Sequence, residues 1–201
     1  MKVINRNFLL IVATLLAGIF IAGCATSSKM QVVPPERVIS APEEGMSLVV
    51  FMRPSDFGGA VQSSVFEIKD EKPSLIGIVS ANTKVSHQVK PGDYLFMVIG
   101  ESADFMSAEL EADKTYYALV TPRMGVWKAR FSLKPIHAAE LDTEEFNDWF
   151  EQCGWMENTP ASEGWARENA NSIYSKYTEY YADWMEKDAA DRPKLLAEDG
   201  K

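Results

Sequence analysis

The chain has 201 residues with a formal net charge of −9 and a sequence pI near 4.8, and 46% of its residues are hydrophobic. This composition is typical of a folded domain and excludes a disordered chain or a polytopic membrane protein. The acidic balance argues against nucleic acid as a partner, because binding a phosphate backbone requires a basic face. Acids are concentrated late in the chain: residues 140–201 carry 16 Asp and Glu against 6 Lys and Arg, whereas residues 45–139 carry 10 of each.

Residues 1–23 have the pattern of a secretory signal peptide. Lys2 and Arg6 precede the uncharged residues 8–21. As a helix, that segment would cover only about 21 Å of the roughly 30 Å hydrocarbon core, so we expect no stable transmembrane anchor. Residues 21–24, with the sequence Ile-Ala-Gly-Cys, resemble a bacterial lipobox, in which cleavage precedes the cysteine. The alternatives are a plain signal peptide followed by an incidental cysteine, or a buried helix.

Cys24 is therefore the predicted lipidation site. The resemblance to bacterial lipoproteins implies several acyl chains on this residue, and each buried methylene contributes about 0.8 kcal/mol to membrane binding. Ala25 stands where Asp would retain an enterobacterial lipoprotein at the inner membrane, so the expected location is the outer membrane, facing the periplasm. Lipidation leaves Cys153 without a partner in the mature chain. We expect a buried structural thiol there, with an intermolecular disulfide as the alternative.

Residues 24–44 are predicted to be a lipid-anchored tether that holds the domain away from the bilayer. The segment after Cys24 contains three prolines, and its hydrophobic residues follow no sustained period. The alternative is that the apolar pairs Val32-Val33 and Val38-Ile39 dock as an extended edge segment.

Residues 45–135 are predicted to form an antiparallel β-sandwich of about seven or eight short strands. Short apolar segments alternate with turn-forming residues, among them Pro91-Gly92, which suits a type II turn with the glycine at positive φ. The expected strands are 46–53, 61–69, 75–79, 84–90, 94–99, 105–111, 115–121 and 126–133.

These strands differ in how many faces they bury. In residues 126–133 apolar residues alternate with Lys128, Arg130 and Ser132, which is typical of a half-exposed strand. Residues 46–52, 94–99 and 116–120 are apolar on both faces, so another element must cover their outer faces. Because the helical region is acidic, we expect some of the bases Arg123, Lys128, Arg130 and Lys134 to pair with acids from residues 140–191.

Residues 136–190 are predicted to be an acidic, aromatic-rich helical extension that covers one side of the sandwich. A first helix over 142–153 starts with Asp142 and Glu145 at capping-box spacing, and a longer helix spans roughly 163–188. Aromatic residues recur along the longer helix at steps of three and four. We interpret this stripe as the face that packs on the sheet, with a ligand-stacking shelf as the alternative. Residues 191–201 are predicted to be a frayed tail.

Three motifs follow the lipobox in order: residues 51–55 (FMRPS) with 57–59 (FGG), residues 89–94 (VKPGDY) and residues 112–117 (ADKTYY). In this order and spacing they resemble an uncharacterised bacterial family, the domain of unknown function 2846, which often occurs in lipoproteins. The resemblance covers about residues 45–135 and implies a compact β-sandwich on a lipid tether. The family carries no catalytic or ligand residues that map onto this chain, and the helical extension lies outside the match.

No motif for catalysis stands out. His87 and His137 are the only histidines, and we interpret His87 as a core or edge residue rather than a base. The sequence contains no nucleophile elbow, zinc-protease motif, phosphate loop or calcium loop. We therefore expect a non-enzymatic envelope lipoprotein without cofactor or metal. Its expected partners are the membrane, through acylated Cys24, and envelope proteins.

The alternative function is a small-ligand or glycan-binding lipoprotein. Exposed aromatic residues at strand ends and in the 155–165 loop would form its site, with Trp155, Trp165 and Trp184 as the candidate contacts. Two of these side chains exposed around a concavity would favour this alternative, whereas burial of all three would remove its site.

Overall fold

The computed structural model describes residues 27–57, 61–123 and 130–201. The predicted signal peptide and Cys24 lie outside these residues, as do Trp127 and Lys128 of the last predicted strand. Within the described ranges, no helix is long and apolar enough to cross a membrane.

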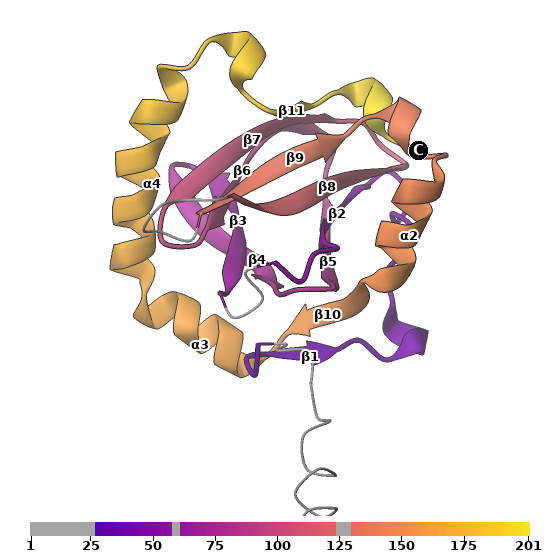
Figure 1. Ribbon diagram of the computed structural model, residues 1–201, viewed down its shortest axis with the longest axis horizontal. Coiled ribbons are helices and arrows are strands. Elements are labelled where there is room, and N and C mark those ends of the chain that lie inside the picture. Colours follow the sequence, from indigo (N-terminus) through magenta and orange to yellow (C-terminus); the bar gives the residue numbers. More distant parts are fainter. Residues whose placement is uncertain (1–26, 58–60, 124–129) are drawn as a thin grey trace, which may run out of the picture.

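In the described part of the chain, eleven strands form two sheets that pack face to face (Figure 1). The strands are β1 (Met30–Val32), β2 (Ser47–Arg53), β3 (Ser63–Lys69), β4 (Lys72–Val79), β5 (Thr83–Val89), β6 (Gly92–Ile99), β7 (Ala103–Leu110), β8 (Lys114–Arg123), β9 (Arg130–Ile136), β10 (Gly154–Asn158) and β11 (Lys194–Leu195). The six-stranded sheet has the order β1-β10-β5-β2-β8-β9, and the five-stranded sheet has the order β11-β7-β6-β3-β4.

The predicted fold class is confirmed: the protein is mainly β, with a sandwich of two sheets and helices late in the chain. Each of the eight predicted strands has a counterpart with ends shifted by a few residues, although residues 126–129 of the last one lie outside the described residues. Gly92 has the expected positive φ, 147°. Strand pairing is mixed rather than wholly antiparallel, because β2 pairs in parallel with β8, β10 with β5 and β11 with β7. Between β2 and β8 the described residues form β5 of the six-stranded sheet and four strands of the five-stranded sheet. The chain then comes back to the six-stranded sheet as β8, which runs parallel to β2.

The main core lies between the two sheets. Phe51 of β2 and Phe96 of β6 are completely buried there, and their ring centroids are 5.1 Å apart in an edge-to-face arrangement. In β9 the predicted alternation is confirmed for the described residues, because Phe131 and Leu133 are buried while Arg130 is exposed.

Helices cover both outer faces of the sandwich, not one face as predicted. The three helices of the C-terminal third are α2 (Glu144–Gln152), α3 (Pro160–Glu168) and α4 (Ala170–Met185). α4 packs on the five-stranded sheet, where Tyr177 and Trp184 join Met97 and Phe105 in a second core. α2 packs on the six-stranded sheet, where Phe146 joins Met52 and Leu119 in a third core.

Figure 1 shows α4 and α2 on opposite sides of the strands. The reason is visible in the strands themselves. β2 and β8, both apolar on two faces, belong to the six-stranded sheet, whereas β6 belongs to the five-stranded sheet. Each sheet therefore has an apolar outer face, and each needs its own cover.

The helix ends also differ from the prediction. The longer predicted helix is two helices that meet at Asn169, whose side-chain amide donates to the carbonyl oxygen of Trp165 at 2.8 Å and competes with helix continuation. In α2 the cap is Thr143 rather than Asp142, because the Thr143 side chain accepts from the Phe146 amide at 3.2 Å.

The predicted tether is docked from Met30 onward. β1 pairs antiparallel with β10, Met30 is buried, and the Val33 amide donates to the carbonyl oxygen of Trp155 at 3.0 Å. Residues 30–32 therefore form an edge strand, as the alternative expected for Val32, whereas Val38 and Ile39 lie in no strand and Ile39 is 46% exposed. Val32 itself remains 70% exposed.

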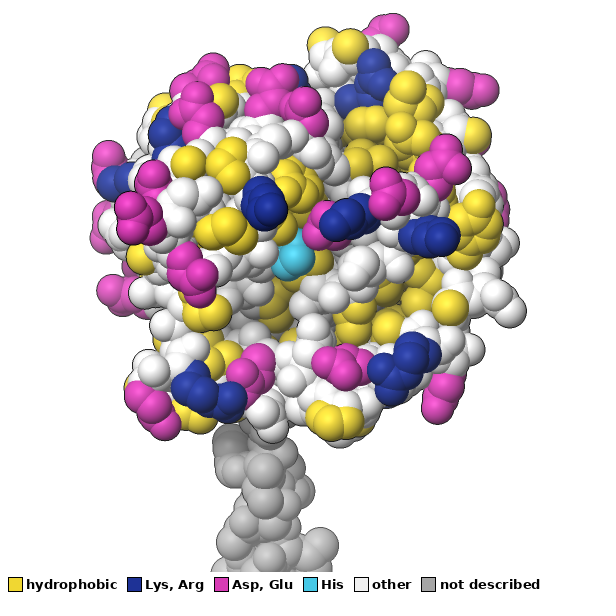
Figure 2. Space-filling view, turned by 180° about the vertical axis from the view of Figure 1, so that it is seen from behind, with side chains coloured by type: hydrophobic (Ala, Val, Ile, Leu, Met, Phe, Trp, Pro, Cys, Tyr) yellow, Lys and Arg dark blue, Asp and Glu magenta, His cyan; other side chains and the backbone are white. Residues whose placement is uncertain are grey.

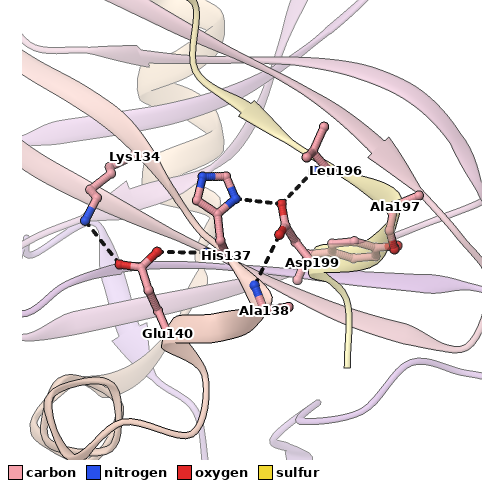
Figure 3. Close-up of polar contacts among 8 residues, drawn as sticks. Lys134, His137, Ala138, Glu140, Leu196, Ala197 and Asp199 are labelled. Atoms are coloured by element: carbon pink, nitrogen blue, oxygen red, sulfur yellow. Dashed lines mark hydrogen bonds and ion pairs between the residues drawn. The ribbon is translucent and has the colours of Figure 1, made fainter.

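The predicted frayed tail is also docked. Leu195 is completely buried in β11, which pairs with β7 at the edge of the five-stranded sheet. The buried Asp199 carboxylate accepts from the Ala138 amide at 3.1 Å and the Leu196 amide at 2.8 Å, and it lies 2.9 Å from His137 Nδ1 (Figure 3). Burial and these contacts outweigh the polar composition of residues 191–201.

Candidate functional site

A buried arginine organises the loop that follows β2. The Arg53 side chain, in the sequence motif FMRPS, is completely buried and donates to the carbonyl oxygens of Phe57 at 3.0 Å and Val61 at 2.9 Å. Its guanidinium also lies 4.6 Å from the ring centroid of Phe131. Burial lowers the pKa of Arg53, because desolvation disfavours the charged form. This arginine therefore holds the described ends of the 54–62 loop against the core.

An apolar cavity of about 350 Å³ opens beside this loop. β2 and β8 are parallel, with Met52 opposite Leu119, so both strands end at the same edge of the sheet. Trp149 of α2 contributes another wall, and Phe57 is 55% exposed. The lining consists of Pro54, Ser55, Phe57, Leu119, Val120, Thr121, Pro122 and Trp149. None of these side chains is charged, so the cavity suits an apolar group.

The N-terminal segment reaches the domain at this same end. The Ser27 amide donates to Ser80 Oγ at 3.2 Å, and Ser27 Oγ is 3.5 Å from Gln62 Oε1. Two residues beyond Ser80, the Asn82 side chain donates to the Asp56 carboxylate at 2.6 Å. Ser27, the 54–62 loop and the turn at 80–82 are therefore neighbours.

The structure places the three candidate tryptophans in three different environments. Trp184 is only 5% exposed and packs 5.9 Å from the Phe105 ring. Trp165 is partly buried against the core between the sheets and against the α4 core. Trp155 is partly buried in β10, 5.8 Å from the Phe150 ring. No two of them are exposed around one concavity, and the three do not form a shelf.

Trp155 instead helps to enclose a buried lysine. Lys84 Nζ lies 3.6 Å from the Phe150 ring centroid and 4.7 Å from that of Trp155, and it donates to the Phe150 carbonyl oxygen. Burial lowers the pKa of Lys84. The nearby Cys153 is a free, buried thiol, as predicted, and burial raises its pKa to about 11. Cys153 is therefore protonated at neutral pH and is a poor nucleophile.

Both histidines contact carboxylates. His87 Nε2 lies 2.8 Å from Glu67 Oε2, which links β5 of one sheet to β3 of the other. His137 Nδ1 lies 2.9 Å from Asp199, so this pair fastens the C-terminal tail (Figure 3). Among the described residues, no group of three or more His, Cys, Asp or Glu has an arrangement that would hold a metal ion.

Elsewhere the surface mixes charge and apolar groups. Figure 2, seen from behind, shows acidic and basic side chains interspersed, with hydrophobic side chains visible between them. Near the end of α4 a hollow of about 430 Å³ is lined by Tyr181 and Trp184 together with Arg192 and Lys194. The Arg192 guanidinium lies 5.3 Å from the Trp184 ring and covers part of it.

The FMRPS motif and Phe57 of the FGG segment were the sequence signals near the apolar cavity. The buried role of Arg53 and the contributions of Thr121 and Trp149 come from segments far apart in the chain, so sequence reasoning missed them. No protein-family model matches the chain, and a search of curated proteins found no match.

Proposed function

We propose that the protein is a lipid-anchored envelope protein that binds a segment of another envelope protein at the end of the sandwich next to its anchor. The lipobox supports attachment through acylated Cys24, and Ala25 supports the outer membrane, facing the periplasm. The order of the three sequence motifs supports a place in the domain of unknown function 2846. The proposed role is non-enzymatic: the domain holds its partner close to the membrane.

The docked N-terminal segment supports a position close to the bilayer. Only three residue steps separate Cys24 from Ser27, which is bonded to the domain, and an extended chain spans about 3.3–3.6 Å per residue. A 21-residue tether over 24–44 would reach about 70 Å, whereas three steps reach about 10 Å. The loops around Ser27 would therefore lie near the membrane surface.

The observation that carries the proposal is the uncharged cavity beside the exposed Phe57 at this end. An aromatic side chain exposed next to an apolar hollow is typical of protein interfaces, where a few apolar anchors fill pockets on the partner. The cavity therefore fits an apolar side chain on a segment of a membrane-proximal partner.

Glycan binding has weaker support. It relied on an exposed aromatic shelf, and Trp155, Trp165 and Trp184 lie apart with none of them exposed. We therefore place the binding site at the cavity rather than at residues 155–165.

The anchor is tested by replacing Cys24. The Cys24→Ser precursor should lose acyl labelling and fail normal signal processing, whereas Cys153→Ser should keep the label because Cys153 is buried in the domain. Acyl label that persists on Cys24→Ser would overturn the lipoprotein proposal.

The binding site is tested by a photo-crosslinking amino acid at position 57 in intact envelopes. We expect a discrete adduct that disappears when Thr121→Arg places a charge in the exposed lining of the cavity. Thr178→Arg, on the exposed face of α4, is the matched control and should keep the adduct. An adduct that survives Thr121→Arg, or an equal adduct from a probe at the exposed Tyr174, would contradict the proposed site.

A further inference from the structure

A second hollow, distinct from the apolar cavity, gathers positive charge in an acidic protein. It has a volume of about 280 Å³ and lies between α4 and the ends of β7, β8 and β9. Its lining includes three bases, Arg123, Arg130 and Lys187, and two acids, Asp104 and Asp183. The chain as a whole carries a net charge of −9, so a local excess of bases is unusual here.

The buried acid in this hollow positions two of the bases. The Asp104 side chain is 7% exposed; its Oδ2 lies 3.3 Å from Arg123 Nη2 and its Oδ1 lies 3.4 Å from Lys187 Nζ. Each carboxylate oxygen is thus already engaged. Asp104 neutralises one positive charge, holds both bases in place, and leaves one charge in excess.

The third base has no such partner. Arg130 is exposed, and within the described ranges no acid forms an ion pair with it. Arg130 is also the direct cross-strand partner of Arg123 in the β8–β9 pair. Two like charges directly opposite each other on neighbouring strands are destabilising, and Asp104 offsets the charge of Arg123 but not that of Arg130.

The Trp184 ring forms part of the wall of this hollow and also of the hollow of about 430 Å³ described above. Trp184 is 95% buried, and its indole Nε1 has no hydrogen-bond acceptor among the described residues. Buried polar groups without a partner are uncommon in folded proteins. An oxyanion in the hollow would supply the negative charge that the three bases lack.

We propose that this hollow binds a phosphate group, held by the guanidinium groups of Arg123 and Arg130 and by the Lys187 ammonium. Arginine suits the planar, two-pronged contact with phosphate oxygens, and lysine adds a point charge. Asp183 of α4 also lines the hollow and weakens the attraction. The phosphate belongs either to a small soluble compound or to a phospholipid headgroup, because both present the same oxygens.

Calorimetric titration with inorganic phosphate tests the site. The protein is residues 24–201 with Cys24→Ser, which contains every described residue, and potassium chloride of equal ionic strength controls for screening. We expect saturable binding that weakens about tenfold or more in Arg130→Gln, because one of the three cations is lost. Arg167→Gln, an exposed arginine of α3, is the matched control and should bind like the parent.

A gain-of-binding variant separates this proposal from a loss of folding. Asp183→Asn removes a negative charge from the lining and should tighten phosphate binding severalfold, while circular dichroism shows an unchanged fold. No binding at millimolar phosphate, equal weakening by Arg130→Gln and Arg167→Gln, or weaker binding in Asp183→Asn would each overturn the site.

Co-sedimentation with vesicles identifies the source of the phosphate. Vesicles of phosphatidylcholine alone are compared with vesicles that also contain phosphatidic acid. Retention on the second kind that requires Arg130 assigns the site to a lipid headgroup, whereas phosphate binding without such retention assigns it to a soluble phosphate compound. Failure of the site would leave the lipid anchor and the apolar cavity unaffected, because neither uses these residues.

Discussion

The two helical covers of the sandwich bury their sheets by different means. α4 has 16 residues and presents its own aromatic stripe: Tyr177, Tyr181 and Trp184 surround Phe105 with ring centroids 5.4–6.2 Å away. α2 has only nine residues, and Phe146 is its one buried residue. A long amphipathic helix therefore covers a sheet by itself, whereas a short one depends on its neighbours.

The neighbours of α2 come from the segment that follows it and from the sheet. Cys153, directly after α2, is buried in the same core as Phe146, and Tyr117 of β8 lies 4.9 Å from the Phe146 ring. On the other side, Lys84 of β5 packs on the Phe150 ring. Lys84 and Cys153 thus bury apolar surface that α2 alone does not cover.

The C-terminal tail connects the two covers. After α4, the chain pairs with β7 through β11 and then reaches the turn before α2, where Asp199 bonds the Ala138 amide (Figure 1, Figure 3). Gly200 allows this close approach, since a Cβ at that position would lie 2.6 Å from Tyr116 Cζ. The tail is therefore part of the folded domain.

Removal of the whole α4 cover should have the largest effect on the stability of the fold. Deletion of residues 161–201 removes nearly all of α3, all of α4 and β11, and it exposes Met97 and Phe105 on the five-stranded sheet. The lost apolar burial approaches the typical stability of about 5–15 kcal/mol, so the fragment 25–160 should aggregate or be partly unfolded. A soluble fragment with unchanged thermal melting would show that α4 is not a structural cover and would make its aromatic face a partner or membrane-surface site.

Single truncations compare the two covers directly. Trp184→Ala should lower the free energy of unfolding by about 3–5 kcal/mol. Phe146→Ala should lower it by an amount near the lower end of that range, because each ring contacts two others but phenylalanine buries the smaller side chain. Denaturant titration measures both, with Tyr174→Ala, at an exposed site on α4, expected to stay within about 0.5 kcal/mol of the parent. A larger loss for Phe146→Ala would reverse the ranking of the covers.

High pH should weaken the α2 cover through Cys153. Its pKa is about 11 in the folded protein, above the ordinary value near 9, so the folded state holds this proton more tightly than the unfolded chain. The resulting stabilisation is fully present below about pH 9 and is lost as pH rises to about 11, an effect of about 2–3 kcal/mol.

The Cys153 effect is measured by comparison with Cys153→Ala. Between pH 9 and 11 the variant should lose less stability than the parent in chemical denaturation. Lys84, whose pKa is lowered by burial, acts in the opposite direction in both proteins. The Cys153 charge raises the pKa of Lys84 in the parent only, which adds to the expected difference between the two proteins. Parallel losses in the two proteins would exclude the thiol as the cause.

The smallest loss of stability is expected when the docking of the C-terminal tail is weakened. Asp199→Ala leaves the Ala138 and Leu196 amides without their acceptor and should cost about 1–3 kcal/mol locally. Hydrogen exchange at Thr115 and Lys201, whose backbones bond each other, reports tail release, and the exposed Glu198→Ala is the control. Faster exchange at the start of α2 as well would show that the tail supports that cover, whereas no change at Lys201 would contradict the docking role.

The positions of the strands could be predicted from the local sequence, because hydrophobic alternation and turn-forming residues are patterns of only a few neighbouring residues. The segment 46–53 is the clearest case, since its apolar run both located β2 and required an outer cover. The buried face of α4 was predicted equally well, because its large apolar residues recur at helical spacing: Ile173, Tyr177, Tyr180, Tyr181 and Trp184. The break at Asn169 was not, because it depends on a side-chain amide that competes with the helix.

The candidate site was accessible only in part. The FMRPS motif lies beside the cavity but was interpreted only as part of a family resemblance, and nothing in it indicates that Arg53 is buried or that Thr121 and Trp149 share a cavity with Phe57. The three tryptophans were selected by residue type, and their separation depends on three different packing partners. The expectation that Lys134 pairs with a late acid is confirmed by its contact with Glu140 at 3.3 Å, whereas Arg123 pairs with Asp104 of β7 instead.

Local patterns thus account for the eight longer strands, the aromatic face of α4 and the buried state of Cys153, since each depends on hydrophobic periodicity or on immediate neighbours. The short strands β1, β10 and β11 have two to five residues, too few to show a period, and they exist because distant segments supply their hydrogen-bond partners. Two further features were also beyond the local sequence: the sheet on which each helix packs, and the juxtaposition of Arg123, Arg130 and Lys187. They depend on contacts between residues far apart in the chain, which only the folded arrangement brings together.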